Sequence, residues 1–173
     1  SQSPREYALT HKKLFARLSD VAFRSMDQSN GYSTQELVKL STDPHSGIRF
    51  WAVRGLSTRP ANDTDRNKAL IAASNDVSPS VAIAACDGLL SAESSSTRQK
   101  AVERLIKLAD VNRHDHFAAV AALNILDMNA ELSAGDKEQL EGLVRQTKKP
   151  PVRLGKYVGK LIDHATRATE TAQ

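Results

Sequence analysis

The amino-acid sequence predicts an all-α fold made of repeated helix pairs. Three observations support this: apolar residues recur at three- and four-residue steps, proline and glycine cluster between the apolar segments, and one segment recurs 33 residues later. Apolar and polar residues do not alternate over any run of strand length, so we expect no sheet. The 173 residues suit a single domain, residues 1–173, of about eight or nine helices.

The apolar period gives the approximate bounds of each helix. The first helix is expected at about 5–27, with this apolar face: Tyr7, Leu14, Leu18, Val21, Ala22 and Met26. In the next, at about 34–42, Ser33 and Glu36 are spaced to form a capping box, and Pro79 suits the first position of a later helix. The further helices are expected near 46–57, 64–75, 79–91, 97–109, 116–128, 134–147 and 152–168.

A sequence repeat organises the middle of the chain. Residues 43–56, DPHSGIRFWAVRGL, align without a gap to residues 76–89, DVSPSVAIAACDGL. The matched pairs are Asp43 with Asp76, Ile48 with Val81, Ala52 with Ala85, Gly55 with Gly88, and Leu56 with Leu89. A third copy, FAAVAALNIL, covers 117–126, and each copy follows a leucine-rich helix. We therefore expect a repeat core at about 34–128, between the N-terminal helix and C-terminal capping helices at 134–168.

The repeat favours a HEAT-like stack, an armadillo-like α-α superhelix. One helix pair cannot bury both of its apolar stripes, whereas stacked pairs bury them against each other. Gly55 and Gly88 each cost about 1 kcal/mol inside a helix, so their recurrence at one repeat position predicts a close helix crossing. The period also fits ankyrin and tetratricopeptide repeats, but the Thr-Pro-Leu-His turn of the first and the Trp/Gly/Tyr pattern of the second are missing.

Composition excludes some classes of protein. Apolar residues make up 40% and charged residues 25% of the chain, as in ordinary globular domains. The net charge of +4, from 24 Lys and Arg against 20 Asp and Glu, is low for a dedicated DNA-binding protein. No apolar run approaches the ~20 residues that a membrane span needs. Since the first residues carry no apolar signal region, we expect either a cytosolic protein or a mature or excised piece.

The repeat copies resemble a known family. Residues 37–56, LVKLSTDPHSGIRFWAVRGL, resemble the HEAT-like region that lies C-terminal to the catalytic domain in many bacterial sulfatases, and ordered matches continue to about residue 127. The matching residues are Asp43, Ile48, Arg49, Phe50, Trp51, Ala52, Gly55 and Leu56 in the first copy, Pro79, Val81, Ile83, Ala84, Ala85 and Leu89 in the second, and Ala122, Leu123, Asn124, Leu126 and Asp127 in the third. The final helix, from Val152, also fits the family order.

This resemblance implies an accessory or docking domain of a larger enzyme, or a free-standing relative. The catalytic Cys/Ser-x-Pro-x-Arg motif of sulfatases is absent, because Cys86 is followed by Asp87-Gly88-Leu89, so no catalytic residue is carried over. Ala82 stands where the family's second copy has arginine. The resemblance implies a parent sulfuric ester hydrolase that is periplasmic or secreted; without it, a cytoplasmic location is expected.

Two features raise the question of reactive or metal-binding side chains. Cys86 lies in an apolar run beside Asp87, which favours a buried thiol, because reactive thiols need nearby positive charge. His114-Asp115-His116 resembles a metal-binding fragment, but a helix start sets the two imidazoles about 200° apart and no second ligand pair is near in sequence. We expect a polar helix-start turn capped by Asn112 or Asp115, with no metal and no cofactor.

Arginines flank Trp51, the single tryptophan of the chain. Trp51 follows Phe50 in an apolar helix, which favours packing within the repeat over stacking on a ligand. Arg49 and Arg54 are candidates for an interaction surface; the alternative is that they are solvated or brace a loop. In the second case Arg49, at the start of its helix, is placed to bond the preceding acidic turn at Asp43.

The last helix carries a basic stripe opposite an apolar face. The stripe contains Arg153, Lys156, Lys160, His164 and Arg167, and the apolar face contains Leu154, Tyr157, Val158, Leu161, Ile162 and Ala165. A solvated polar face suits a terminal repeat, and a patch for an anionic polymer or acidic partner is the alternative. Asp163 interrupts the stripe and aromatic residues are few, so nucleic-acid binding is the less favoured hypothesis.

Together these patterns predict a binding scaffold that has no catalytic machinery of its own. The leading hypothesis is the accessory domain of a sulfatase, which braces the catalytic domain or mediates protein–protein contacts. The alternatives are a stand-alone protein-interaction scaffold and a HEAT-like nucleic-acid-binding protein that uses the charges of 148–167. The expected partner is thus a protein, either a sulfatase catalytic domain or another subunit, and no membrane contact is expected.

Overall fold

The computed structural model describes residues 3–146 and 152–167, and every regular element within these ranges is an α-helix. In chain order these are α1 (Pro4–Thr10), α2 (Lys12–Met26), α3 (Thr34–Leu40), α4 (Ser46–Ser57), α5 (Thr64–Ala73), α6 (Pro79–Leu89), α7 (Ser95–Leu108), α8 (His116–Asn129), α9 (Ala134–Gln146) and α10 (Val152–Arg167). The predicted all-α fold is confirmed. From α3 onward each helix begins and ends within two residues of its expected bounds.

The single helix expected at 5–27 is instead two helices, because the chain breaks at His11. The backbone of His11 leaves the helical region, at φ −112° and ψ 33°. Its N–H still donates to the carbonyl of Tyr7, and its ring stacks on the Tyr7 ring with 4.0 Å between centroids. His11 therefore ends α1 and precedes the first residue of α2.

Polar side chains fix where several helices begin. The capping box predicted before α3 is present, since the Ser33 hydroxyl accepts from the Glu36 N–H at 3.3 Å and the Glu36 carboxylate accepts from the Ser33 N–H at 2.8 Å. Asp63 caps α5 and Ser94 caps α7 through a single bond each, in which the side-chain oxygen accepts from a backbone N–H of the first turn. Pro79 occupies the start of α6, as expected.

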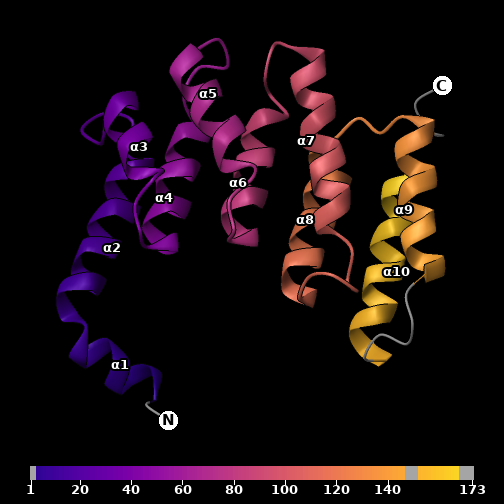
Figure 1. Ribbon diagram of the computed structural model, residues 1–173, viewed down its shortest axis with the longest axis horizontal. Coiled ribbons are helices and arrows are strands. Elements are labelled where there is room, and N and C mark those ends of the chain that lie inside the picture. Colours follow the sequence, from indigo (N-terminus) through magenta and orange to yellow (C-terminus); the bar gives the residue numbers. More distant parts are fainter. Residues whose placement is uncertain (1–2, 147–151, 168–173) are drawn as a thin grey trace.

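The helices form two layers that run along the long axis of the molecule. One layer contains α3, α5, α7 and α9, and the other contains α2, α4, α6, α8 and α10. In the second layer each helix packs on the next, whereas in the first layer α3 packs on α5 and α7 on α9, without comparable packing between α5 and α7. Consecutive helices from the two layers pair as α3–α4, α5–α6, α7–α8 and α9–α10. Figure 1 shows this row, with α1 and α2 at one end and α9 and α10 at the other.

Two glycines allow the second layer to pack closely, as the repeat predicts. A Cβ added to Gly55 of α4 would lie 2.6 Å from the backbone oxygen of Ser25 in α2. One added to Gly88 of α6 would collide with the hydroxyl of Ser57 in α4. In the third copy Ile125 occupies the glycine position, so α8 has a side chain where the other two copies have a close helix crossing.

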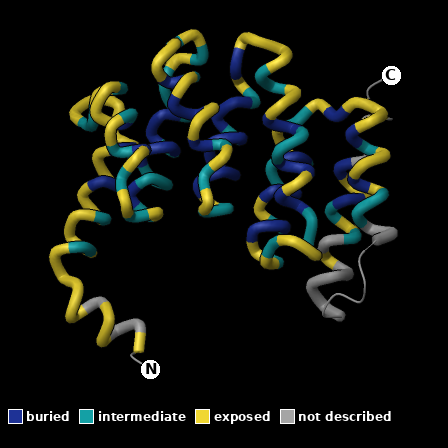
Figure 2. Tube along the Cα trace, in the orientation of Figure 1, coloured by how far each residue is buried: buried dark blue, intermediate teal, exposed yellow. Residues whose placement is uncertain are grey.

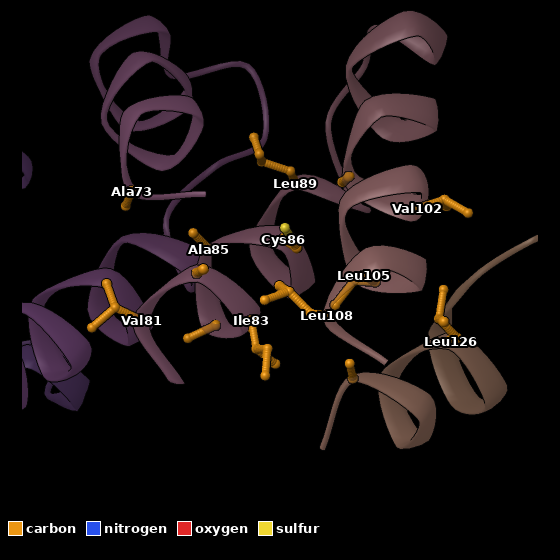
Figure 3. Packing of buried hydrophobic residues seen from close by; sticks show 14 of the residues in the cluster. Ala73, Val81, Ile83, Ala85, Cys86, Leu89, Val102, Leu105, Leu108 and Leu126 are labelled. Atoms are coloured by element: carbon orange, nitrogen blue, oxygen red, sulfur yellow. The ribbon is translucent and has the colours of Figure 1, made fainter. Parts of the chain in front are cut away.

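The core is concentrated in the middle of the stack, around α6 (Figure 2). Every residue from Val81 to Cys86 is buried. Figure 3 shows side chains of α6, including Ile83 and Cys86, beside those of α7, including Leu105 and Leu108. The small residues of α6 bring its neighbours close, and the leucines of α7 fill the space between the layers.

Candidate interaction surface

Arg49 links the acidic turns of the first two repeat copies. Its Nε and Nη2 donate to the two carboxylate oxygens of Asp76 at 2.7 and 2.8 Å, and its Nη1 donates to the carbonyl oxygen of Asp43 at 2.9 Å. The guanidinium of Arg49, helped by the N–H of Ser78, holds the pKa of Asp76 below its ordinary value. All three guanidinium nitrogens of Arg49 thus bind within the chain, which is a loop-bracing role.

This link belongs to a series that stops after the second copy. An aspartate follows the first helix of each copy and accepts a hydrogen bond from the backbone N–H two residues further on: Asp43, Asp76 and Asp110. Arg17 of α2 binds the first carboxylate and Arg49 of α4 binds the second. Ala82 occupies the next arginine position in α6, and Asp110 pairs with its near neighbour Arg113 at 3.4 Å.

Arg54, the second flanking arginine, also joins neighbouring copies. Its Nη1 donates to Asp87 at 2.8 Å, from α4 to α6, and Asp87 accepts a further hydrogen bond from Asn129 of α8 at 3.2 Å. Trp51 is half-buried and meets Phe50 edge-on, with 5.3 Å between ring centroids. Arg49 and Arg54 therefore lie where they join the helices of neighbouring copies.

Sequence reasoning missed Arg66, which is fully buried. Its Nε donates to the carbonyl of Leu56 at 3.1 Å and its Nη2 donates to the carbonyl of Gly88 at 2.8 Å. These carbonyls belong to the last turns of α4 and α6, where the helix dipole favours a positive charge. A signal for this role was present in the sequence, because a second arginine, Arg98, also lies near the start of its helix, α7. Arg98 donates to the carbonyls of Ala92 and Glu93, which follow α6.

The surroundings of Cys86 and of His114-Asp115-His116 show what these side chains do in the fold. Cys86 is fully buried, and this burial raises the pKa of its thiol to about 12. Asp115 caps α8 by accepting from the N–H groups of Phe117 and Ala118, as one of the two expected caps, while the Asn112 side chain instead bonds Asp110. Among the residues described, the structure brings together no group of His, Cys, Asp and Glu suited to a metal ion.

The basic stripe of the last helix is described only in part. Lys160 is exposed on α10, whereas the side chains of Arg153 and Lys156 lie outside the described residues. Ile162 and Ala165 are buried as the apolar face predicts. Tyr157 was expected on that face but is 47% exposed, so the buried face is narrower than the sequence suggested.

Several exposed apolar side chains lie on α1 and α2, at one end of the stack. We call the surface that they form the α1–α2 face. It consists of these exposed side chains: Tyr7, Leu9, Phe15, Phe23 and Met26. Phe23 is 84% exposed, and Tyr7 meets Phe15 edge-on. Because α2 uses its Val21 and Ser25 side against α4, this second apolar face has no covering layer in the described chain. Tyr7 and Met26 fit the apolar period expected for this region, but Tyr7 is 43% and Met26 is 40% exposed.

Two grooves lie on opposite layers of the stack. One, of 340 Å³, runs between α4, α6 and α8 and is mainly apolar, with Phe50, Ile83 and Phe117 among its lining residues. The other, of 310 Å³, lies between α5 and α7 and contains the cationic side chains Lys100 and Arg104. The apolar groove opens between α6 and α8, where Ile125 replaces the glycine of the other two copies. The matching glycine of α6, Gly88, lets α6 pack closely on α4.

No described helix is both long and apolar enough to cross a lipid bilayer. Comparison of the chain with protein-family models, with curated proteins and with solved structures finds no significant match. The inference of function therefore rests on the sequence patterns and on the geometry described above.

Proposed function

We propose that this chain is a non-catalytic, HEAT-like repeat scaffold that docks on a protein through the α1–α2 face. The observation that carries the proposal is the exposure of Phe15, Phe23 and their apolar neighbours on adjoining helices. Exposed apolar residues that gather on one surface, rather than scatter singly, are typical of protein contact sites.

The position of this surface in the stack supports docking. Inner helices such as α4 and α6 bury an apolar face against each neighbour in the row. The outer face of α2 has the same apolar character, but a terminal repeat that faces water needs a polar outside. A partner that covers Phe15, Phe23 and Met26 would remove this apolar area from water, at roughly 25 cal/mol per Å².

The partner that we propose is the catalytic domain of a sulfatase, periplasmic or secreted, of which this chain is the accessory domain. Support comes from the resemblance across about residues 37–127. Two residues of that pattern hold the stack together, as expected of a region whose role is bracing: Arg49 joins the first two copies, and Gly55 lets α4 pack closely on α2. A stand-alone interaction scaffold is the alternative, with another subunit on the same face.

Nucleic-acid binding has less support. Arg49 and Arg54 are held by Asp76 and Asp87, so their positive charges are largely compensated. The described part of the basic stripe contributes Lys160 as an exposed cation. Affinity for phosphate backbones depends on several uncompensated cations gathered on one surface.

The experiment begins with the reading frame that encodes the chain, where the proposal requires a Cys/Ser-x-Pro-x-Arg motif upstream. The catalytic domain encoded there is then titrated with the isolated chain by calorimetry. We expect Phe15→Ser/Phe23→Ser to weaken binding by at least about ten-fold, since each buried aromatic anchor contributes on the order of 1 kcal/mol or more.

The matched control is Phe117→Ser, which removes an equally exposed phenylalanine from α8. We expect this control to bind within about two-fold of the unaltered chain. Equal loss in both variants, or no loss in the α2 variant, would contradict the assignment of the docking face. A reading frame without the motif would contradict the sulfatase assignment alone.

A further inference from the structure

The groove between α5 and α7 differs from the rest of the surface in its charge. Within their layer α3 packs closely on α5 and α7 on α9, but α5 and α7 lack such close packing. Three cations of α7 line the groove between them: Lys100, Arg104 and Lys107. Their spacing of four and three residues places them on one side of the helix.

These cations are largely uncompensated by the protein. Neither Lys100 nor Lys107 forms an ion pair with any residue that the structure describes. Glu103 is the one acidic residue among the described lining residues, and its carboxylate lies 3.5 Å from the side-chain amide of Gln99. Three positive charges against one negative charge give the groove a net attraction for anionic groups.

Arg104 is also held in place. Its Nε donates to the carbonyl oxygen of Ser74, the residue that ends α5, at 3.1 Å. This bond spans the groove and fixes the guanidinium plane, while its remaining N–H groups have the fork geometry that matches a carboxylate. A cation fixed before binding loses less side-chain entropy when it binds an anion than a free one.

The groove has an apolar component beside the charges. Leu89 of α6 lies at its base, almost fully buried, and Ile71 of α5 lines it with 47% of its surface exposed. The groove therefore suits a ligand that combines carboxylates with an apolar side chain. A nucleic acid suits it less, because no described lining residue is aromatic for base stacking.

We propose that the α5–α7 groove binds an acidic segment of a protein partner, with its carboxylates on Lys100, Arg104 and Lys107 and an apolar side chain against Ile71. This site goes beyond the docking proposed above, since it uses neither α1 nor α2 and lies on the other layer. It gives the scaffold a second, charge-selective contact. Such a contact raises the rate of association and restricts orientation.

The test is fluorescence anisotropy with a labelled peptide of alternating glutamate and leucine. Lys100→Glu/Lys107→Glu should weaken binding by about ten-fold or more, because two attractions become repulsions. The control is Lys12→Glu/Lys13→Glu, which changes two exposed lysines of α2. Like the test variant, it lowers the net charge of the chain from +4 to zero. We expect the control to bind within about three-fold of the unaltered chain.

Ile71→Ser tests the apolar part of the proposal separately. It should weaken binding of the glutamate–leucine peptide by about three- to ten-fold, and it should leave binding of a leucine-free polyglutamate peptide unchanged. Equal losses in the two lysine variants, or no binding by the unaltered chain, would overturn the site. Tighter binding of a single-stranded oligonucleotide than of the peptide, lost in Lys100→Glu/Lys107→Glu, would overturn the assignment of a protein partner.

Discussion

The close crossing of α2 and α4 predicts a large effect from the smallest substitution, Gly55→Ala. The added methyl group would lie 2.6 Å from the backbone oxygen of Ser25, and 3.1 Å from a methyl carbon of Leu37. This oxygen belongs to the last turn of α2 and, unlike the end of a flexible side chain, it cannot rotate away, so the two helices must separate. Overpacking of this kind costs about 1–3 kcal/mol, and the rigid neighbour places this site in the upper half of that range.

Alanine also favours a helix over glycine by about 1 kcal/mol, which offsets part of the cost. We therefore expect Gly55→Ala to lower the free energy of unfolding by about 1–2 kcal/mol, measured by urea titration with circular dichroism. Gly142→Ala in α9 is the matched control, since an added Cβ there meets nothing within 4 Å. The control should gain about 0.5–1 kcal/mol. A Gly55→Ala chain as stable as the control would refute the close crossing.

Three further substitutions or treatments follow from the structure. Arg49→Met should cost about 2–3 kcal/mol near neutral pH. The pKa of Asp76 is lowered in the folded chain, so the Arg49–Asp76 pair stabilises the fold above about pH 4. Its contribution disappears as the pH falls through the lowered pKa. The unfolding free energies of the unaltered chain and of Arg49→Met should therefore converge in acid. Cys86 should resist iodoacetamide in the native chain at about pH 8 and react after unfolding, and rapid native alkylation would contradict its burial. Arg66→Met should cost about 2–3 kcal/mol in the same urea titration, because it removes the charged donor that joins the last turns of α4 and α6; a loss under about 1 kcal/mol would contradict that role.

The repeat explains why most of the fold was predictable. Gly55 and Gly88 cost helix stability, so their recurrence at one position indicated a packing constraint, and the structure shows both at close helix crossings. The capping box of Ser33 and Glu36 depends on residues three positions apart, and such local contacts can be read from sequence.

Features that depend on distant partners were not predictable. The role of Arg66 does not follow from its neighbours in sequence, because its partners are carbonyls at the ends of two other helices. Lys100 and Lys107 of α7 line the proposed anion-binding groove because α5 does not pack closely on α7. Tyr7 fits the helical period of a buried face, but the period cannot tell whether another helix covers that face.

Hydrogen exchange tests the proposed docking face most directly. Backbone amide exchange is measured for the isolated chain and for the chain bound to its proposed partner, a sulfatase catalytic domain. The proposal predicts slower exchange in α2 around Phe15 and Phe23 on binding, with exchange in α8 around Phe117 unchanged. Slower exchange confined to α8, or no change in α2, would contradict the claim that the α1–α2 face docks on a protein.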